Sequence, residues 1–159
     1  MAKKLKTTRI TPTSFVGTTG AVDEVVFNPT EIPNAVFHNG GASLLRSVTM
    51  IDYDDNSGMA HDLYFFQLGT NDLGTLGDVI SITDVELLAN KCLGRVILKA
   101  VGDGTSGDAI LSRVATTESI NLVVQAEDSS SSIFVACVCQ ASTVCTAAGR
   151  ELIFGFEQL

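Results

Sequence analysis

The chain contains little charge and few of the residues from which reactive sites are built. Only 18% of its 159 residues are charged, and tryptophan is absent. It has two histidines and four cysteines with no Cys-x-x-Cys pair, so the close ligand pairs of a zinc site are missing. Cys137 and Cys139 would face the same way on a strand. We therefore expect no metal and no cofactor, and reduced, buried cysteines that pack as small apolar residues.

The sequence also has no long apolar run. None approaches the roughly 18 residues of a membrane-spanning helix, and no apolar stretch follows the basic start, so we expect no secretory signal. The net charge is −8, yet four of the ten basic residues fall within the first nine positions: Lys3, Lys4, Lys6 and Arg9. The acidic remainder argues against a nucleic-acid partner, because phosphates require a basic stripe. We expect a protein that is made in a cytoplasm and binds neither nucleic acid nor membrane.

No motif of catalytic chemistry stands out. The chain has no Gly-x-Ser-x-Gly, and its two histidines lie in no recognisable nucleophile context. The loop Asp52–Gly58 departs from a calcium-binding EF-hand, because Ser57 and Leu63 occupy the positions that need glycine and glutamate. The loop Gly102–Asp108 lacks the lysine of a phosphate-binding loop. We predict that the protein is not an enzyme and interpret both loops as turns, leaving open whether either binds an ion.

What the sequence does contain is a series of short apolar runs separated by turns rich in glycine, serine and threonine. β-Branched and aromatic residues dominate these runs, which is typical of strands. A capping box from Thr83 to Glu86 predicts at most one short helix, near 84–91. We predict an all-β fold, an antiparallel β-sandwich of jelly-roll type with eight to ten strands. The clearest strands are expected at residues 44–53, 62–68, 92–101, 120–125, 133–140 and 151–156.

The chain length favours one compact unit. We predict a basic N-terminal arm over residues 1–13 and a single β-sandwich domain over residues 14–159. Pro29 and Pro33 interrupt the stretch after Val22–Phe27, which indicates an edge strand or no strand. The strands at 44–53 and 62–68 are joined by a short connection that suggests a long hairpin.

The strand expected at 133–140 is apolar on both faces, whereas a strand with one wet face should alternate. Two interpretations stay open. The strand is central and covered on both sides by its own chain, or one of its faces meets another subunit.

Several short patterns occur together between Ile32 and Leu159. They are Asn34–Ala35 before a glycine-rich turn; Leu45, Ser47, Val48 and Asp52 in one strand; Asp62, Leu63, Phe65 and Phe66 in the next; Ile82–Thr83; and Glu151–Leu152 leading into Phe154–Phe156. In the order of these patterns along the sequence, the chain resembles the small β-sandwich proteins of tailed bacteriophages that decorate or cement capsids. The patterns are structural positions, and no catalytic residue is carried over.

The resemblance implies a non-enzymatic structural protein on the capsid exterior of a virion, made in the host cytoplasm. Such a protein stabilises the shell by bridging subunits of the major capsid protein, as a homo-oligomer for which a trimer is favoured. Four basic residues would then anchor the arm on an acidic capsid lattice: Lys3, Lys4, Lys6 and Arg9. The alternative is a carbohydrate- or receptor-binding β-module of a phage fibre, spike or tail. Sugar sites favour exposed aromatic rings, and Tyr53 and Tyr64 are the two tyrosines of a chain without tryptophan.

Overall fold

The computed structural model describes residues 4–19, 22–52, 60–98, 114–117, 120–140, 143–145 and 149–159. Within them the chain forms antiparallel strands and one short helix, α1 (Asp84–Ala89). The strands are β1 (Leu5–Ile10), β2 (Gly17–Thr19), β3 (Val25–Ile32), β4 (Ala42–Asp52), β5 (His61–Phe66), β6 (Cys92–Leu98), β7 (Val114–Thr117), β8 (Leu122–Gln125), β9 (Ile133–Cys139), β10 (Thr143–Cys145) and β11 (Arg150–Gln158).

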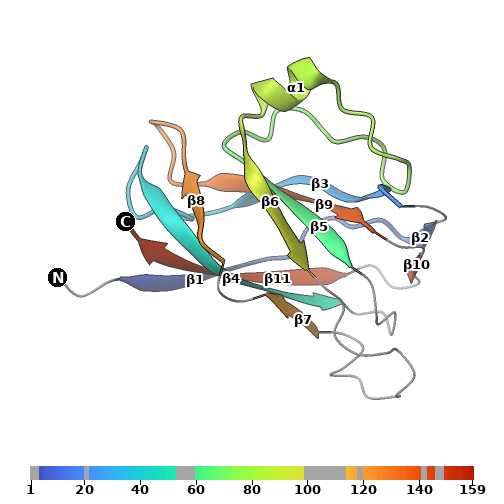
Figure 1. Ribbon diagram of the computed structural model, residues 1–159, viewed down its shortest axis with the longest axis horizontal. Coiled ribbons are helices and arrows are strands. Elements are labelled where there is room, and N and C mark those ends of the chain that lie inside the picture. The colour runs from blue at the N-terminus through green and yellow to red at the C-terminus, as the bar shows by residue number, and fades with distance from the viewer. Residues whose placement is uncertain are drawn as a thin grey trace.

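The strands form two large sheets that pack face to face (Figure 1). The first sheet has the order β1-β11-β4-β7. β7 and β8 both pair with the side of β4 that faces away from β11: β8 pairs with residues 42–45 and β7 pairs with residues 48–51. The second sheet has the order β3-β9-β5-β6. A separate short ribbon joins β2 and β10. The prediction of an all-β sandwich is confirmed.

The strand pairs are nested along the chain. The first strand pairs with the last, β3 pairs with β9, β4 pairs with β7 and β8, and β5 pairs with β6. A long double strand folded at β5–β6 and wrapped around a core produces this nesting, which is the arrangement of a jelly roll. The wrapping also explains why β4 and β5 lie in different sheets, so the predicted hairpin between them is wrong.

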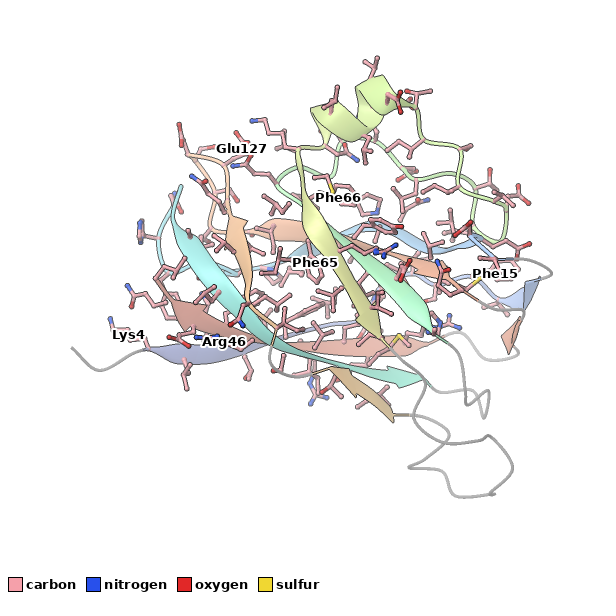
Figure 2. The ribbon with its side chains drawn as sticks, in the orientation of Figure 1. Lys4, Phe15, Arg46, Phe65, Phe66 and Glu127 are labelled. Carbon is pink, nitrogen blue, oxygen red and sulfur yellow. The ribbon has the colours of Figure 1, made fainter. Side chains whose placement is uncertain are left out.

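The main core fills the space between the sheets. Along β11, Leu152, Phe154 and Phe156 alternate with outward residues and are fully or almost fully buried. The Phe154 ring meets Phe65 of the second sheet edge to face, with centroids 6.0 Å apart, and stacks on Phe156 at 6.2 Å. Figure 2 shows Phe65 between the sheets and Phe66, its neighbour in sequence, on the other side of the second sheet.

A second, smaller core lies on the outer side of the second sheet. There Ala136 and Val138 of β9 pack with Val25, Phe66 and Leu73, and all five residues are buried. Leu73 belongs to the segment 67–83, which together with α1 covers this side of the sheet (Figure 1). Of the two interpretations of the doubly apolar strand, the first holds: β9 lies between β3 and β5 and is covered by its own chain.

Side-chain hydrogen bonds fix the covering segment to the second sheet. The Asn28 side chain donates to the Gly74 carbonyl at 2.9 Å and accepts from the Leu73 amide at 2.8 Å. Asn28 lies where the β3–β9 register shifts, next to Pro29. The expectation of an edge strand around this proline is confirmed, because β3 ends one side of the second sheet.

The short helix begins as its sequence predicts. The Thr83 side chain accepts from the Glu86 amide, and the Glu86 carboxylate accepts from the Thr83 amide, which completes the capping box. The helix ends at Ala89, and Lys91 adopts the left-handed conformation at φ 52°. The chain then enters β6 directly, at Cys92.

The beginning of the chain is part of the sandwich. Residues Leu5–Ile10 of the expected arm form β1, an edge strand that pairs with β11 from Leu5 opposite Glu157 to Ile10 opposite Leu152. Within this strand, Ile10 is buried in the main core. The basic character of residues 3–9 therefore belongs, for its described part, to a sheet edge.

Candidate interaction surfaces

The two large sheets differ in how their outer sides are covered. The segment 67–83 and α1 cover the second sheet, whereas the described chain leaves the outer side of the first sheet open. We call the outward side chains of β1, β11, β4 and β8 the outer sheet face. Residues that pair directly across strands share a face, so the register assigns its members. They are Leu5, Thr7 and Arg9; Glu157, Gly155, Ile153 and Glu151; Ala42, Leu44, Ser47, Thr49 and Ile51; and Val123 and Gln125. Arg46, at the register shift, also belongs to this face because it reaches Glu157.

Apolar side chains are exposed on the outer sheet face. Leu5 is 72% exposed and Val123 is 52% exposed, and they lie at the two ends of one row that runs through Glu157 and Leu44. An edge strand with an exposed leucine is unusual, because edge strands of monomers commonly carry charge at such positions. Leu5 and Val123 are therefore candidate contact residues of this face.

The middle of this face is hollow. Thr7, Gly155 and Ser47 follow one another across β1, β11 and β4, and all three have small side chains or none. A side chain on Gly155 would place its Cβ 2.5 Å from the Ser47 hydroxyl. The resulting hollow of about 350 Å³ is lined by Leu5, Lys6, Thr7, Arg46, Ser47, Gly155 and Phe156.

The charges of the outer sheet face cancel one another. Arg9 forms an ion pair with Glu151, and Arg46 Nε donates to Glu157 Oε2 at 2.7 Å. Arg46 also donates to the Asn121 side chain, which fixes its guanidinium beside the hollow. Figure 2 places Lys4 and Arg46 at the same end of this sheet. The pairs stabilise the fold little, because they are at the surface, but they keep the face electrically neutral.

The structure does not gather the predicted anchor residues into one patch. Lys3 lies outside the described residues, and Lys4 is exposed where the chain enters β1. Lys6 points inward: its ammonium donates to the Val36 carbonyl at 2.7 Å and lies 4.3 Å from the centre of the Phe37 ring. Burial lowers the pKa of Lys6. Lys6 and Arg9 thus point to opposite sides of β1.

A second exposed apolar surface lies on the helix. Val85 and Leu88 of α1 are 76% and 77% exposed, and their spacing of three residues places them on one side of the helix. Leu87, between them in sequence, packs into the small core instead. We call Val85 and Leu88 the helix tip. It lies outside the second sheet, so it and the outer sheet face are on opposite sides of the sandwich (Figure 1).

A polar network lies on β5, β6 and the end of β9. The carboxylate of Asp62, which is 4% exposed, accepts from Arg95 Nη1 at 3.2 Å and from Gln140 Nε2 at 2.9 Å. Gln140 Nε2 also donates to Asp23 at 3.2 Å. Burial raises the pKa of Asp62 above its ordinary value of 3.8; Arg95 opposes this shift, and Asp23 adds to it.

This raised pKa predicts the pH dependence of the variant Asp62→Asn. The folded state holds the Asp62 proton more tightly than the unfolded chain, so this group favours folding at low pH. That contribution is lost as the pH rises through the folded-state pKa. Relative to the unmodified protein, Asp62→Asn should therefore gain stability between pH 3.8 and neutrality. Urea denaturation of both proteins across this range measures the difference; a difference that falls with rising pH would contradict the assignment.

The cysteines follow the prediction in part. Cys137 and Cys139 are buried on the same face of β9, within the main core. Cys92 is free but exposed at the start of β6, so the expectation of burial is wrong there, because β6 is an edge strand. The side chain of Cys145 lies outside the description, as do the loops at Tyr53–Gly58 and Gly102–Asp108. The described residues contain no group of three or more histidine, cysteine or acidic side chains that could hold a metal ion, and no helix among them is long and apolar enough to cross a bilayer.

Comparisons with known proteins add no family. No protein-family model matches the chain, and no curated protein matches it. Among solved structures, one similarity is to a chain described as "Structure of infectious bursal disease virus Gx strain", with 9% identity and a TM-score of 0.18. It covers 99% of this chain, which spans about 41% of that chain. A score this low shows no shared fold, so the fold assignment depends on the strand order described above.

Proposed function

We propose that the chain is a non-enzymatic structural protein of a bacteriophage virion that decorates the capsid exterior and stabilises the shell by bridging capsid subunits. The observation that carries the proposal is the presence of exposed apolar side chains on opposite outer sides of one sandwich. A bridging protein needs two contact surfaces and a stiff body between them. The outer sheet face and the helix tip are two such surfaces.

The body between these surfaces supports this role. The main core joins the sheets through Phe65 and Phe154, and the small core joins the second sheet to the segment that precedes α1. A contact at one side is therefore connected to the other through packed side chains. Binding to assembled shells alone would raise their stability by linkage, and weak contacts suffice because many copies act together.

The direct test is the number of copies of the chain in purified particles of the phage that encodes it. Quantitative mass spectrometry should give a copy number in proportion to that of the major capsid protein, and labelled antibodies should mark the shell exterior. A few copies confined to the tail or to one vertex would contradict the proposal. So would the absence of the chain from particles.

A binding experiment then tests the two surfaces. Particles without the chain are mixed with purified protein carrying Leu5→Asp or Leu88→Asp, and bound protein is measured after sedimentation. Each substitution places a charge in an apolar contact, and we expect apparent affinity to fall at least about tenfold, which corresponds to about 1.4 kcal/mol. The melting temperature of the loaded particles should fall with occupancy.

The matched control is Val16→Asp, which introduces the same charge at an exposed valine outside both surfaces. It should bind particles as the unmodified protein does. Equal losses for all three variants would indicate that added charge, and not the two surfaces, controls binding. Substitutions are preferable to deleting the first nine residues, since that deletion would remove most of β1 from the sheet.

A further inference from the structure

We infer that the outer sheet face pairs with the same face of a second copy of this chain, about a two-fold axis. The inference rests on the proposed function and deepens it, because it names a second copy as the partner of the outer sheet face and leaves the helix tip for the shell. The dimer then presents two helix tips that bridge the shell, so Leu5→Asp weakens particle binding by separating the two copies. Three properties of the face carry it: a protruding side chain beside a hollow, neutral charge on an acidic chain, and a floor of small residues.

The first property is shape. Leu5 protrudes from β1 with 72% of its surface exposed, and it stands at the edge of the hollow over Gly155. A two-fold axis brings residue i of one copy to residue j of the other and the reverse. When a knob and a hollow lie side by side on one face, a single rotation therefore seats each Leu5 in the hollow of the other copy. The side chains of Leu5 and Thr7 stand beside this hollow, and Gly155 leaves room at its floor.

The second property is charge. The described side chains of the outer sheet face include two arginines and two glutamates, all in ion pairs within the face. The whole chain has ten basic and eighteen acidic residues, so its net charge of −8 comes from residues elsewhere. Two copies that met through acidic surfaces would bring like charges together, which costs association free energy. Two copies that meet by the outer sheet face avoid this cost, because the charges there are already paired within each copy.

The third property is flatness. The rows through the middle of the face consist mainly of short side chains: Thr7, Gly155, Ser47 and Thr49. Sheets that pack face to face are about 10 Å apart, a separation that side chains of modest length fill. Ile153 and Ile51, half-buried on the same face, would supply apolar area beside the hollow. The long polar side chains of Arg9, Arg46, Glu151 and Glu157 are held in ion pairs, so they do not extend freely above the described part of this face.

Analytical ultracentrifugation of the full chain tests the pairing in solution. The unmodified protein should show a monomer–dimer equilibrium. Leu5→Asp should raise the dissociation constant at least about tenfold, because it places a carboxylate in the partner's hollow. Gly155→Ala adds an uncharged methyl group to the floor of the hollow and displaces the Ser47 hydroxyl, so it should raise the dissociation constant as well. Leu88→Asp, on the helix tip, should leave the dimer intact, and circular dichroism checks that each variant folds.

A crosslinking experiment tests the geometry. Thr7 lies beside the hollow, close to where the two-fold axis must pass, so a cysteine there should face its copy across the interface. In a Cys92→Ser background, which removes the exposed thiol among the described cysteines, Thr7→Cys should form a covalent dimer under mild oxidation. Leu88→Cys in the same background should not. A dimer that crosslinks through position 88 alone would overturn the inference.

The two proposals fail in different ways. A chain that is monomeric at every concentration, or that forms the trimer implied by the resemblance, overturns the two-fold pairing while particle binding can still be observed. A chain that dimerises as described but is absent from virions keeps the pairing and overturns the capsid function. If both hold, Leu88→Asp separates them, since it should lose particle binding and keep the dimer.

Discussion

The substitution Phe154→Ala is expected to lower the free energy of unfolding by about 3–5 kcal/mol, the usual cost of removing a buried aromatic ring. Phe154 has no exposed surface and contacts both sheets, meeting Phe65 edge to face and stacking on Phe156. The cavity that remains would lie where the two layers join, so the sheets could close it only by moving closer together, which the rest of the packed core opposes. Urea denaturation measures the loss as a lower midpoint with an unchanged slope.

The matched control for this prediction is the next residue towards the N-terminus. Ile153 belongs to the same strand but points to the outer sheet face, where it is only half-buried. Ile153→Ala should cost about 1 kcal/mol, because it removes less buried surface and leaves no enclosed cavity. Equal losses at the two positions would contradict the assignment of the core to the inner side of the sheet.

The second large effect is expected at Leu73, in the segment that covers the second sheet. Leu73 is almost fully buried in the small core, and its carbonyl accepts from the amides of Ser81 and Ile82 at 2.9 and 3.0 Å. Leu73→Ala should cost about 2–5 kcal/mol, and it should do so by loosening this segment from the sheet. Amide hydrogen exchange should then accelerate over residues 67–83 more than in β4 or β11.

Loosening this segment also uncovers Ala136 and Val138 on β9, so the Leu73→Ala variant should bind a hydrophobic dye more strongly than the unmodified protein. The control is Leu88→Ala, a leucine that is mostly exposed on α1 and whose replacement should change stability by less than about 0.5 kcal/mol. If Leu73→Ala raised exchange uniformly along the chain, the covering segment would not be a separate unit of stability.

Local patterns predicted much of the fold. Short apolar runs rich in β-branched and aromatic residues identified β4, β9 and β11, and the capping box of Thr83 and Glu86 identified the helix within two residues of its end. The proline in the stretch around β3 predicted an edge strand, and the register shift beside Pro29 shows the physical reason, since proline cannot donate to a ladder.

Features that depend on distant parts of the chain were not predictable in this way. The pairing of β1 with β11 joins residues about as far apart as the chain permits, and nothing near Leu5 in sequence signals it. Lys6 was predicted to be an anchor residue of the arm, yet its ammonium lies over the Phe37 ring and donates to a backbone carbonyl. The assignment of β4 and β5 to different sheets is likewise a property of the wrapping and not of their short connection.

For the candidate surfaces too, local sequence predicted some features, and others depend on the packing of distant segments. The sequence predicted that β9 was apolar on both sides but could not say what covered it, because the answer lies in the packing of residues 67–83. From the sequence we placed the capsid anchor on the basic residues of the arm. The structure instead shows exposed apolar side chains at Leu5, Val123 and the helix tip. Exposure of an apolar side chain is decided by what the rest of the fold leaves uncovered, and local pattern carries little of that information.

The adjacency of β1 and β11 has a practical consequence for handling the protein. The Gln158 amide donates to the Lys4 carbonyl at 2.9 Å, so both ends of the described chain leave the sandwich at one corner, close to the hollow over Gly155. An affinity tag fused to either end would stand next to that hollow and could obstruct whatever binds there. A reporter inserted elsewhere, or a linker that splices the two ends and opens the chain at a distant turn, would leave it accessible.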